Sequence, residues 1–161
     1  PDAIRARLVI SQQCRPEDLD RTRAAYAAAG VVAELAAFFP DIANRLETTH
    51  LVIARAGAST VAELACAGRP AILVPLPHAI DDHQAANAKA LAESGAALVV
   101  PQPQFTAEAL TARLVALCSD PTALAKAASA AASLARPEAA RTLADRVLTL
   151  IARAGAPVGV R

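Results

Sequence analysis

Residues 55–88, RAGASTVAELACAGRPAILVPLPHAIDDHQAANA, contain the pattern from which the architecture can be inferred. A turn of small residues at 56–58 precedes a helical segment, which Gly68-Arg69-Pro70 ends. A short apolar run, 71–74, then leads into a polar loop. The order strand, turn, helix, strand, loop predicts a parallel sheet with both loops at one edge. Because open α/β sheets bind ligands outside the carboxyl ends of their strands, a nucleotide is expected at this edge.

Length and composition indicate one domain with a substantial apolar core. The chain has 161 residues, 55% of them apolar, with one Tyr, three Phe and no Trp. A net charge of +1 gives no electrostatic support for nucleic acid binding, so no nucleic acid partner is expected. Three isolated cysteines, Cys14, Cys66 and Cys118, suit a reducing compartment better than a disulfide framework or a zinc site. Neither a signal peptide nor an apolar run of about 20 residues is visible, so a cytoplasmic location is expected.

Strand and helix patterns alternate along the rest of the chain. The expected strands are 7–12, one within 31–39, 50–54, 71–75 and 97–100. The expected helices are 16–29, 40–48, 59–67 and 82–94, and the pattern is helical from Thr106 onward. This alternation predicts an α/β fold, a Rossmann-like, doubly wound parallel sheet followed by a helical C-terminal segment.

The glycines indicate that the sheet is incomplete. Doubly wound nucleotide-binding domains begin with a strand and a Gly-rich turn, but the six glycines of this chain contain no G-x-G-x-x-G. We therefore expect that the first strand of the sheet is missing. The predicted organisation is one domain over 1–151, without its opening βα unit, and a frayed tail over 152–161.

Thr60-Val61-Ala62-Glu63 admits two interpretations. The spacing is that of a capping box, in which Thr caps the helix and Glu reaches back to the N-cap amide. Alternatively, the amides at 58–60 bind a diphosphate at the helix N-terminus, and Glu63, one turn inside, accepts hydrogen bonds from both ribose hydroxyls. The small residues at 56–58 favour the second interpretation, because close approach of backbone to a ligand requires them.

A second polar cluster follows the next strand and consists of His78, Asp81, Asp82, His83, Gln84 and Asn87. A metal site is disfavoured, because neither His has a His partner four residues away. A sugar site fits better, since Gln84 and Asn87 lie three residues apart on one helix face and their amides can donate to and accept from hydroxyls. A solvated loop that leads into an ordinary helix is the alternative.

Phe38 and Phe39 end the second expected strand. Neighbouring side chains in a strand point to opposite faces, so one ring can lie in the core while the other flanks a base at the binding edge. Two core residues are the simpler alternative. No Ser/His/Asp or Cys/His arrangement is visible, and the catalytic residues are therefore unknown.

In combination these motifs resemble the C-terminal half of the MurG family, inverting glycosyltransferases of the two-Rossmann (GT-B) architecture. The resemblance covers about residues 5–150. It rests on Arg55–Glu63, Gly68-x-Pro70, Pro75-x-Pro-His78 and Asp82-His-Gln84-x-x-Asn87-Ala88, with further support from Gln12-Gln13, Phe38–Ile42 and 96–105.

The resemblance implies a parent enzyme that transfers GlcNAc from UDP-GlcNAc to undecaprenyl-pyrophosphoryl-MurNAc-pentapeptide in peptidoglycan synthesis. No cofactor and no metal are expected. It implies a peripheral location on the cytoplasmic face of the bacterial plasma membrane. It also implies roles for the site residues. Ala58, Ser59 and Thr60 would face the diphosphate, and Glu63 would face the ribose hydroxyls. Phe38 and Phe39 would border the uracil, and Gln84, with His83 and Asn87, would bind the GlcNAc hydroxyls. Arg55 and His78 match positions near the donor.

The chain departs from the family pattern at Ala56, where many members carry Ser, and at Gln13-Cys14, where a small hydroxylic residue is common. Donor contacts through those hydroxyls are therefore not expected. The family's acceptor domain, with the catalytic base and the membrane-facing patch, is also absent from the sequence. The chain alone is expected to bind donor weakly and to turn over nothing. The alternatives are a UDP-sugar-binding subunit completed by a partner chain, or a GT-B enzyme with another acceptor.

Overall fold

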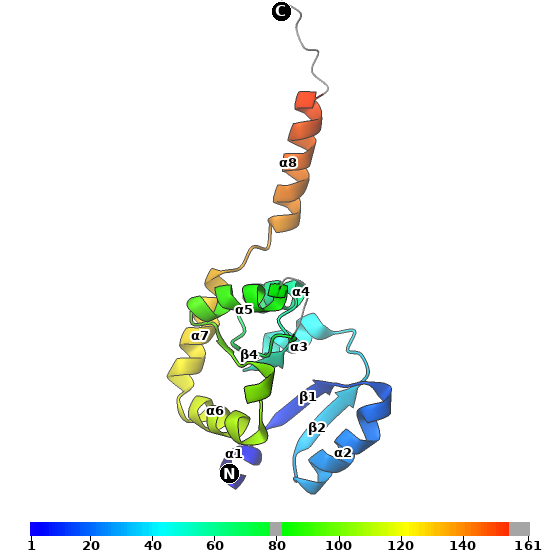
Figure 1. The fold of residues 1–161 in the computed structure, drawn as a ribbon, viewed down its shortest axis with the longest axis vertical. Helices are drawn as coiled ribbons and strands as arrows, with labels where there is room; N and C mark the ends of the chain where they lie inside the picture. The colour runs from blue at the N-terminus through cyan, green and yellow to red at the C-terminus, as the bar shows by residue number, and fades with distance from the viewer. Residues whose placement is uncertain (78–81, 155–161) are drawn as a thin grey trace, which may run out of the picture.

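The described part of the chain, residues 1–77 and 82–154 of a computed structural model, is an α/β fold in which helices surround short parallel strands (Figure 1). The strands are β1 (Val9–Gln13), β2 (Val32–Ala36), β3 (Val52–Ala54), β4 (Ala71–Leu73) and β5 (Ala97–Val99). The helices are α1 (Asp2–Arg5), α2 (Leu19–Ala28), α3 (Ile42–Thr48), α4 (Ala58–Ala67), α5 (His83–Glu93), α6 (Ala107–Ser119), α7 (Pro121–Ser133) and α8 (Ala139–Ala154).

Each expected strand and helix is present, with its ends shifted by a few residues. The segment predicted as one helix over 16–29 is divided into a 3-10 turn, η1 (Pro16–Asp18), and α2. A second 3-10 turn, η3 (Gln102–Gln104), follows β5. The sequence pattern does not indicate α1, a short helix directly before β1.

The strands form two parallel sheets, not the single sheet that the sequence predicts. In one sheet β1 pairs with β2, and in the other β4 lies between β3 and β5. Among the described residues β1 and β3 are not hydrogen-bonded to each other. The Rossmann-like α/β class is confirmed, and the expectation of one continuous sheet is wrong for these residues.

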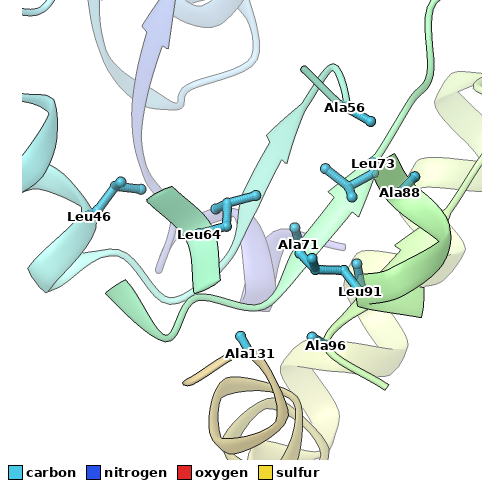
Figure 2. Close-up of a cluster of buried hydrophobic side chains, with 10 residues drawn as sticks. Leu46, Ala56, Leu64, Ala71, Leu73, Ala88, Leu91, Ala96 and Ala131 are labelled. Carbon is cyan, nitrogen blue, oxygen red and sulfur yellow. The ribbon is translucent and has the colours of Figure 1, made fainter. Parts of the chain in front are cut away.

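The hydrophobic core surrounds the three-stranded sheet (Figure 2). Leu73 of β4 is fully buried, and the core around it includes Leu64 of α4, Leu91 of α5, Leu46 of α3 and Ala131 of α7. By contrast, β1 and β2 contribute no buried residue. The apolar packing of the molecule is therefore concentrated on β3, β4 and β5.

Gly68 ends α4, as its pattern predicts. Its φ of 63° is left-handed, and the N–H of Arg69 donates to the carbonyl of Leu64 at 2.9 Å. A Cβ at Gly68 would lie 3.3 Å from the Cβ of Ala132 in α7. Glycine therefore allows both the turn into β4 and the close approach of α4 to α7.

Helix α8 extends away from the rest of the described chain (Figure 1). It carries a set of exposed apolar side chains, Leu143, Val147, Leu148, Leu150 and Ile151. The tail predicted to fray from 152 begins as helix, because α8 continues to Ala154, and 155–161 lie outside the described residues. Within 1–77 and 82–154, no helix combines the length and apolarity needed to cross a membrane.

Candidate functional site

The turn between β3 and α4 lies at the carboxyl end of β3. Ala56 is fully buried, and Gly57, in an extended conformation, takes the N-cap position of α4 without a capping side chain. Thr60 therefore lies inside the first helical turn, and the capping-box interpretation of Thr60 and Glu63 is wrong. The small, uncapped Gly57 accounts for the difference, since its carbonyl accepts the N–H of Val61 at 3.0 Å.

The N-terminus of α4 presents free backbone donors. The N–H groups of Ala58, Ser59 and Thr60 precede the first intrahelical hydrogen bond and have no side-chain cap. Glu63 is exposed one turn further on and makes no hydrogen bond or ion pair with the described residues. An anion at this end would gain about 0.3–1 kcal/mol per charge from the helix dipole. The arrangement combines anion donors with a nearby acceptor carboxylate.

Asn87 brings the second polar cluster to this turn. Its Nδ2 donates to the carbonyl of Ala56 at 3.0 Å, one residue before the N-cap of α4. Gln84, one helical turn earlier in α5, accepts the N–H of Leu76 on its Oε1 at 2.9 Å. Both side chains are half-buried and tie α5 to the loops after β3 and β4. The Oδ1 of Asn87 and the Nε2 of Gln84 make no hydrogen bond to the described residues.

The remainder of that cluster is only partly described. His83 is the exposed first residue of α5, and Asp82 before it has a left-handed φ of 50°. Aspartate is among the residues that tolerate this conformation, which costs most others free energy. The predicted site residue His78 and its neighbour Asp81 lie outside the described residues. Among those described, no three His, Cys, Asp or Glu side chains gather as a metal-ligand group.

Arg55 joins the loops that follow three strands. Its Nη1 donates to the carbonyls of Val74 at 3.1 Å and Pro75 at 3.3 Å, and its Nη2 donates to Oε1 of Gln102 at 2.8 Å. Arg55 itself follows β3, whereas these partners follow β4 and β5. Arg55 therefore lies among the loops at the carboxyl ends of β3, β4 and β5, and its guanidinium is hydrogen-bonded within the protein.

Phe38 and Phe39 have opposite environments, although they follow β2, which ends at Ala36, and do not lie in the strand as the sequence predicts. Phe38 is 70% exposed, whereas Phe39 is 7% exposed. The Phe39 ring contacts the guanidinium of Arg45, which lies 4.0 Å from the ring centroid. The alternative in which both rings are core residues is therefore wrong, and Phe38 is available at the surface after β2.

Arg45 is a residue that the sequence reasoning missed. It donates to both carboxylate oxygens of Glu34 at 2.6 and 2.8 Å, to Asp41 at 2.8 Å and to the hydroxyl of Ser11 at 3.1 Å. Hydrogen bonding to Arg45 lowers the pKa of the Glu34 and Asp41 carboxyls, and these two carboxylates raise the pKa of Arg45 above its ordinary value. The four-residue spacing from Asp41 to Arg45 was the available signal for part of this network.

Two surface hollows lie away from this edge. One, of about 450 Å³, lies where the chain passes from α7 to α8 and is lined in part by Arg136 and Leu143. The other, of about 380 Å³, lies beside α2 and is lined in part by Gln12 and Tyr26, whose hydroxyl donates to Gln12 at 2.6 Å. The candidate site is thus distinct from both hollows.

Comparison with known proteins matches the chain to a described family. The profile of the glycosyltransferase family 28 C-terminal domain matches residues 2–143. A UDP-N-acetylglucosamine--N-acetylmuramyl-(pentapeptide) pyrophosphoryl-undecaprenol N-acetylglucosamine transferase of Rhodospirillum centenum is 62% identical over 148 residues, 92% of this chain and 39% of that protein. The protein of the same name from Paramagnetospirillum magneticum is 55% identical over 94% of this chain and 41% of its own length. The chain therefore spans about two fifths of the curated relatives that it matches.

Solved structures agree with these matches. The crystal structure of Acinetobacter baumannii MurG superimposes with a TM-score of 0.81 at 38% identity, over 88% of this chain and 43% of that one. The spinosyn forosaminyltransferase SpnP has a TM-score of 0.59 at 19% identity, over 94% of this chain and 46% of that one. The second likeness concerns the fold alone.

Proposed function

The chain belongs to the glycosyltransferase family 28 C-terminal domains, and on this basis we propose that it is the donor-binding domain of a GlcNAc transferase. In this proposal the parent enzyme transfers GlcNAc from UDP-GlcNAc to lipid-linked MurNAc-pentapeptide, converting lipid I to lipid II in peptidoglycan synthesis. Both substrates are those in the names of the most similar relatives given above.

The observation that carries the proposal is the uncapped N-terminus of α4 beside Glu63. Three backbone N–H groups without partners, at Ala58, Ser59 and Thr60, suit the diphosphate of a nucleotide sugar. Glu63, exposed and without a partner among the described residues, suits the two ribose hydroxyls.

Further contacts with the nucleotide sugar are proposed for Phe38 and for three residues at the start of α5. Phe38, 70% exposed after β2, would flank the uracil. Gln84 and Asn87 would use their remaining amide groups on the GlcNAc hydroxyls, with His83 beside them at the start of α5. Phe39, being buried, would not contact the base directly.

The chemistry that this edge can supply is stabilisation of the departing UDP. Transfer of the sugar leaves negative charge on the diphosphate, and preorganised N–H groups aimed at that charge lower the barrier without reorganising. The domain would thus contribute leaving-group stabilisation and orientation of the donor. We propose that the catalytic base, acceptor binding and contact with the cytoplasmic face of the membrane belong to parts of the parent enzyme outside this chain.

Titration calorimetry with UDP-GlcNAc tests the site. The chain is expected to bind weakly, and Glu63→Gln is expected to lose about tenfold in affinity, the effect of about 1.4 kcal/mol of lost hydrogen bonding to ribose. Glu47→Gln is the matched control, because Glu47 is an exposed helical glutamate of α3 whose carboxylate makes no hydrogen bond or ion pair with the described residues. Equal affinities for the chain and Glu63→Gln, or no heat from folded protein, would contradict the assignment.

A further inference from the structure

The loop that follows β4 has few backbone groups that can hold it in place. Its sequence after Val74 is Pro75-Leu76-Pro77, and because proline has no N–H, Leu76 carries the one backbone donor of these three residues. No backbone–backbone hydrogen bond joins residues 75–77 to the rest of the described chain. Leu76 is also 44% exposed, so its side chain does not fix the loop in the core. The position of this loop therefore depends on contacts with side chains.

Two side chains supply these contacts. The N–H of Leu76 donates to Oε1 of Gln84 at 2.9 Å. The carbonyls of Val74 and Pro75 both accept from Nη1 of Arg55, at 3.1 and 3.3 Å. No other backbone hydrogen bond of this loop is formed within the described chain. Gln84 and Arg55 therefore hold the loop from two sides.

The contact with Leu76 also fixes the direction in which the Gln84 amide points. A backbone N–H can only donate, so Gln84 turns its Oε1 toward Leu76 and keeps its Nε2 donor for a ligand. Asn87 is fixed in the opposite sense, because the carbonyl of Ala56 can only accept and therefore engages Nδ2, which leaves the Oδ1 acceptor. The two amides thus present one donor and one acceptor, which suits a pair of sugar hydroxyls. Gln84 keeps this orientation only while the backbone of Leu76 stays in place.

The segments on both sides of the loop are anchored in the core. Ala56 and Ala88, the chain neighbours of Arg55 and Asn87, are both fully buried (Figure 2). The loop Pro75–Pro77 contains no buried residue. Of the three segments that these contacts join, the loop is therefore the one whose position depends on the guanidinium of Arg55.

Gln102 holds that guanidinium in turn. The Nη2 of Arg55 donates to Oε1 of Gln102, in η3, at 2.8 Å, the shortest of the three hydrogen bonds that the guanidinium makes. Arg55 is exposed, and a long exposed side chain regains rotamer freedom when one of its contacts is removed. Both terminal nitrogens of Arg55 are directed at the protein, which suits a residue that orders the loop.

We propose that Gln102 and Arg55 are positioning residues for the sugar of the bound nucleotide sugar, an inference that rests on the proposed function. Gln102 orients the guanidinium of Arg55, Arg55 holds the Pro75–Pro77 loop, and the loop fixes the amide of Gln84. In this assignment neither Gln102 nor Arg55 contacts the nucleotide sugar.

The diphosphate part of the site does not depend on this series of contacts. Helix α4 begins with a backbone hydrogen bond of its own, from the N–H of Val61 to the carbonyl of Gly57 at 3.0 Å. The backbone donors at 58–60 therefore keep their places when the Pro75–Pro77 loop moves. Loss of Gln102 is expected to weaken recognition of the sugar and to leave recognition of UDP unchanged.

Amide exchange measured by NMR without nucleotide tests whether Gln102 holds the loop. In Gln102→Ala the N–H of Leu76 is expected to exchange at least about threefold faster, because its contact with Gln84 opens more often. The N–H of Val74 is the internal reference, since it donates to Ala54 of the neighbouring strand at 2.9 Å.

Two further variants complete the set. Gln102→Glu keeps an oxygen acceptor for Arg55 and is expected to restore the slower exchange of the Leu76 amide. Gln104→Ala is the matched control, because Gln104 lies exposed in the same 3-10 turn and its side chain makes no hydrogen bond to the described residues.

Titration calorimetry with UDP and with UDP-GlcNAc tests the effect on the sugar. Gln102→Ala is expected to lower the ratio of the affinity for UDP-GlcNAc to the affinity for UDP at least about threefold. Gln102→Glu and Gln104→Ala are expected to leave this ratio unchanged. A general loss of structure would lower both affinities together, so the ratio separates positioning of the sugar from a purely structural role.

Four outcomes decide against the proposal. Unchanged exchange of the Leu76 amide in Gln102→Ala overturns the role of Gln102 in holding the loop. An equal loss of affinity for both nucleotides, or a Gln102→Glu variant that behaves like Gln102→Ala, overturns the positioning of the sugar through Arg55. Binding of neither nucleotide to the folded, unsubstituted chain overturns the proposed function and the role in sugar binding with it. In that case the exchange of Leu76, measured without nucleotide, still decides whether Gln102 holds the loop.

Discussion

Arg45 connects the two-stranded sheet to the surface that carries Phe38. Its guanidinium pairs with Glu34 of β2 and Asp41 before α3, and it stacks on the ring of Phe39. We expect Arg45→Lys to weaken UDP-GlcNAc binding a few-fold in calorimetry, because an ammonium forms neither the bidentate pair nor the stack. Arg23→Lys is the control, since Arg23 pairs with Asp20 on an exposed helix surface. Equal affinity of Arg45→Lys and the unchanged chain for UDP-GlcNAc would show that Arg45 does not influence donor binding.

The same network makes stability depend on pH. Hydrogen bonding to Arg45 lowers the pKa of Glu34 and of Asp41 in the folded chain. A carboxyl whose pKa is lower in the folded than in the unfolded chain stabilises the fold at pH values above the unfolded pKa of about 4. This stabilisation is lost as the pH falls through the folded pKa. Urea unfolding from pH 7 to pH 3 should therefore show a stability difference between the chain and Arg45→Ala that narrows below about pH 4. A difference that stays constant over this range would argue against the ion pairs as its source.

The ends of the helices could be predicted only where a local signal decides them. Thr106 and Asp120 accept hydrogen bonds from Ala109 and Ala123 and cap α6 and α7, as their sequences indicate. Helix α4 begins before the predicted Ser59, because Gly57 becomes the N-cap through its extended backbone alone. A residue without a side chain gives no capping signal, so a capping box at Thr60 was a reasonable but wrong interpretation.

Substitution of Gly68 tests how closely α4 packs on α7. Gly68→Ala places a Cβ 3.3 Å from Ala132 at a φ of 63°, whereas Gly30→Ala meets nothing within 4 Å at a φ of 64°. Both substitutions carry the left-handed cost of about 1–2 kcal/mol. We expect Gly68→Ala to lower the free energy of unfolding by more than Gly30→Ala, as measured in urea. Equal losses would mean that α7 moves aside without cost.

The whole arrangement contains contacts that the sequence does not reveal. The alternation of strands and helices was sufficient to predict the fold class and the edge that carries the candidate site. The sequence does not reveal that the strands divide into two sheets. Nor does it reveal the hydrogen bonds of Arg55 with Gln102 and of Asn87 with Ala56, which join residues far apart in the chain. Such pairings depend on register and packing, for which a single sequence contains no periodic signal.

The uneven core predicts how the molecule tolerates loss of its last helix. The buried residues of the described chain come from the segment between Phe39 and Ala131, and the apolar residues of α8 are exposed, so α8 contributes nothing to the core. The melting temperature of a chain ending at Glu138, followed by circular dichroism, should therefore lie within a few degrees of that of the full chain. A loss of about 1 kcal/mol shifts the melting temperature by several degrees at this size, so a larger loss would be detected. Its affinity for UDP-GlcNAc should also be unchanged, since none of the proposed donor contacts lies beyond Asn87.

A chain ending at Asp120 is the control and should unfold at a much lower temperature, because it loses Ala131 and the packing of α7 on α4. A large loss on removing α8 alone would show that this helix packs on the body in solution.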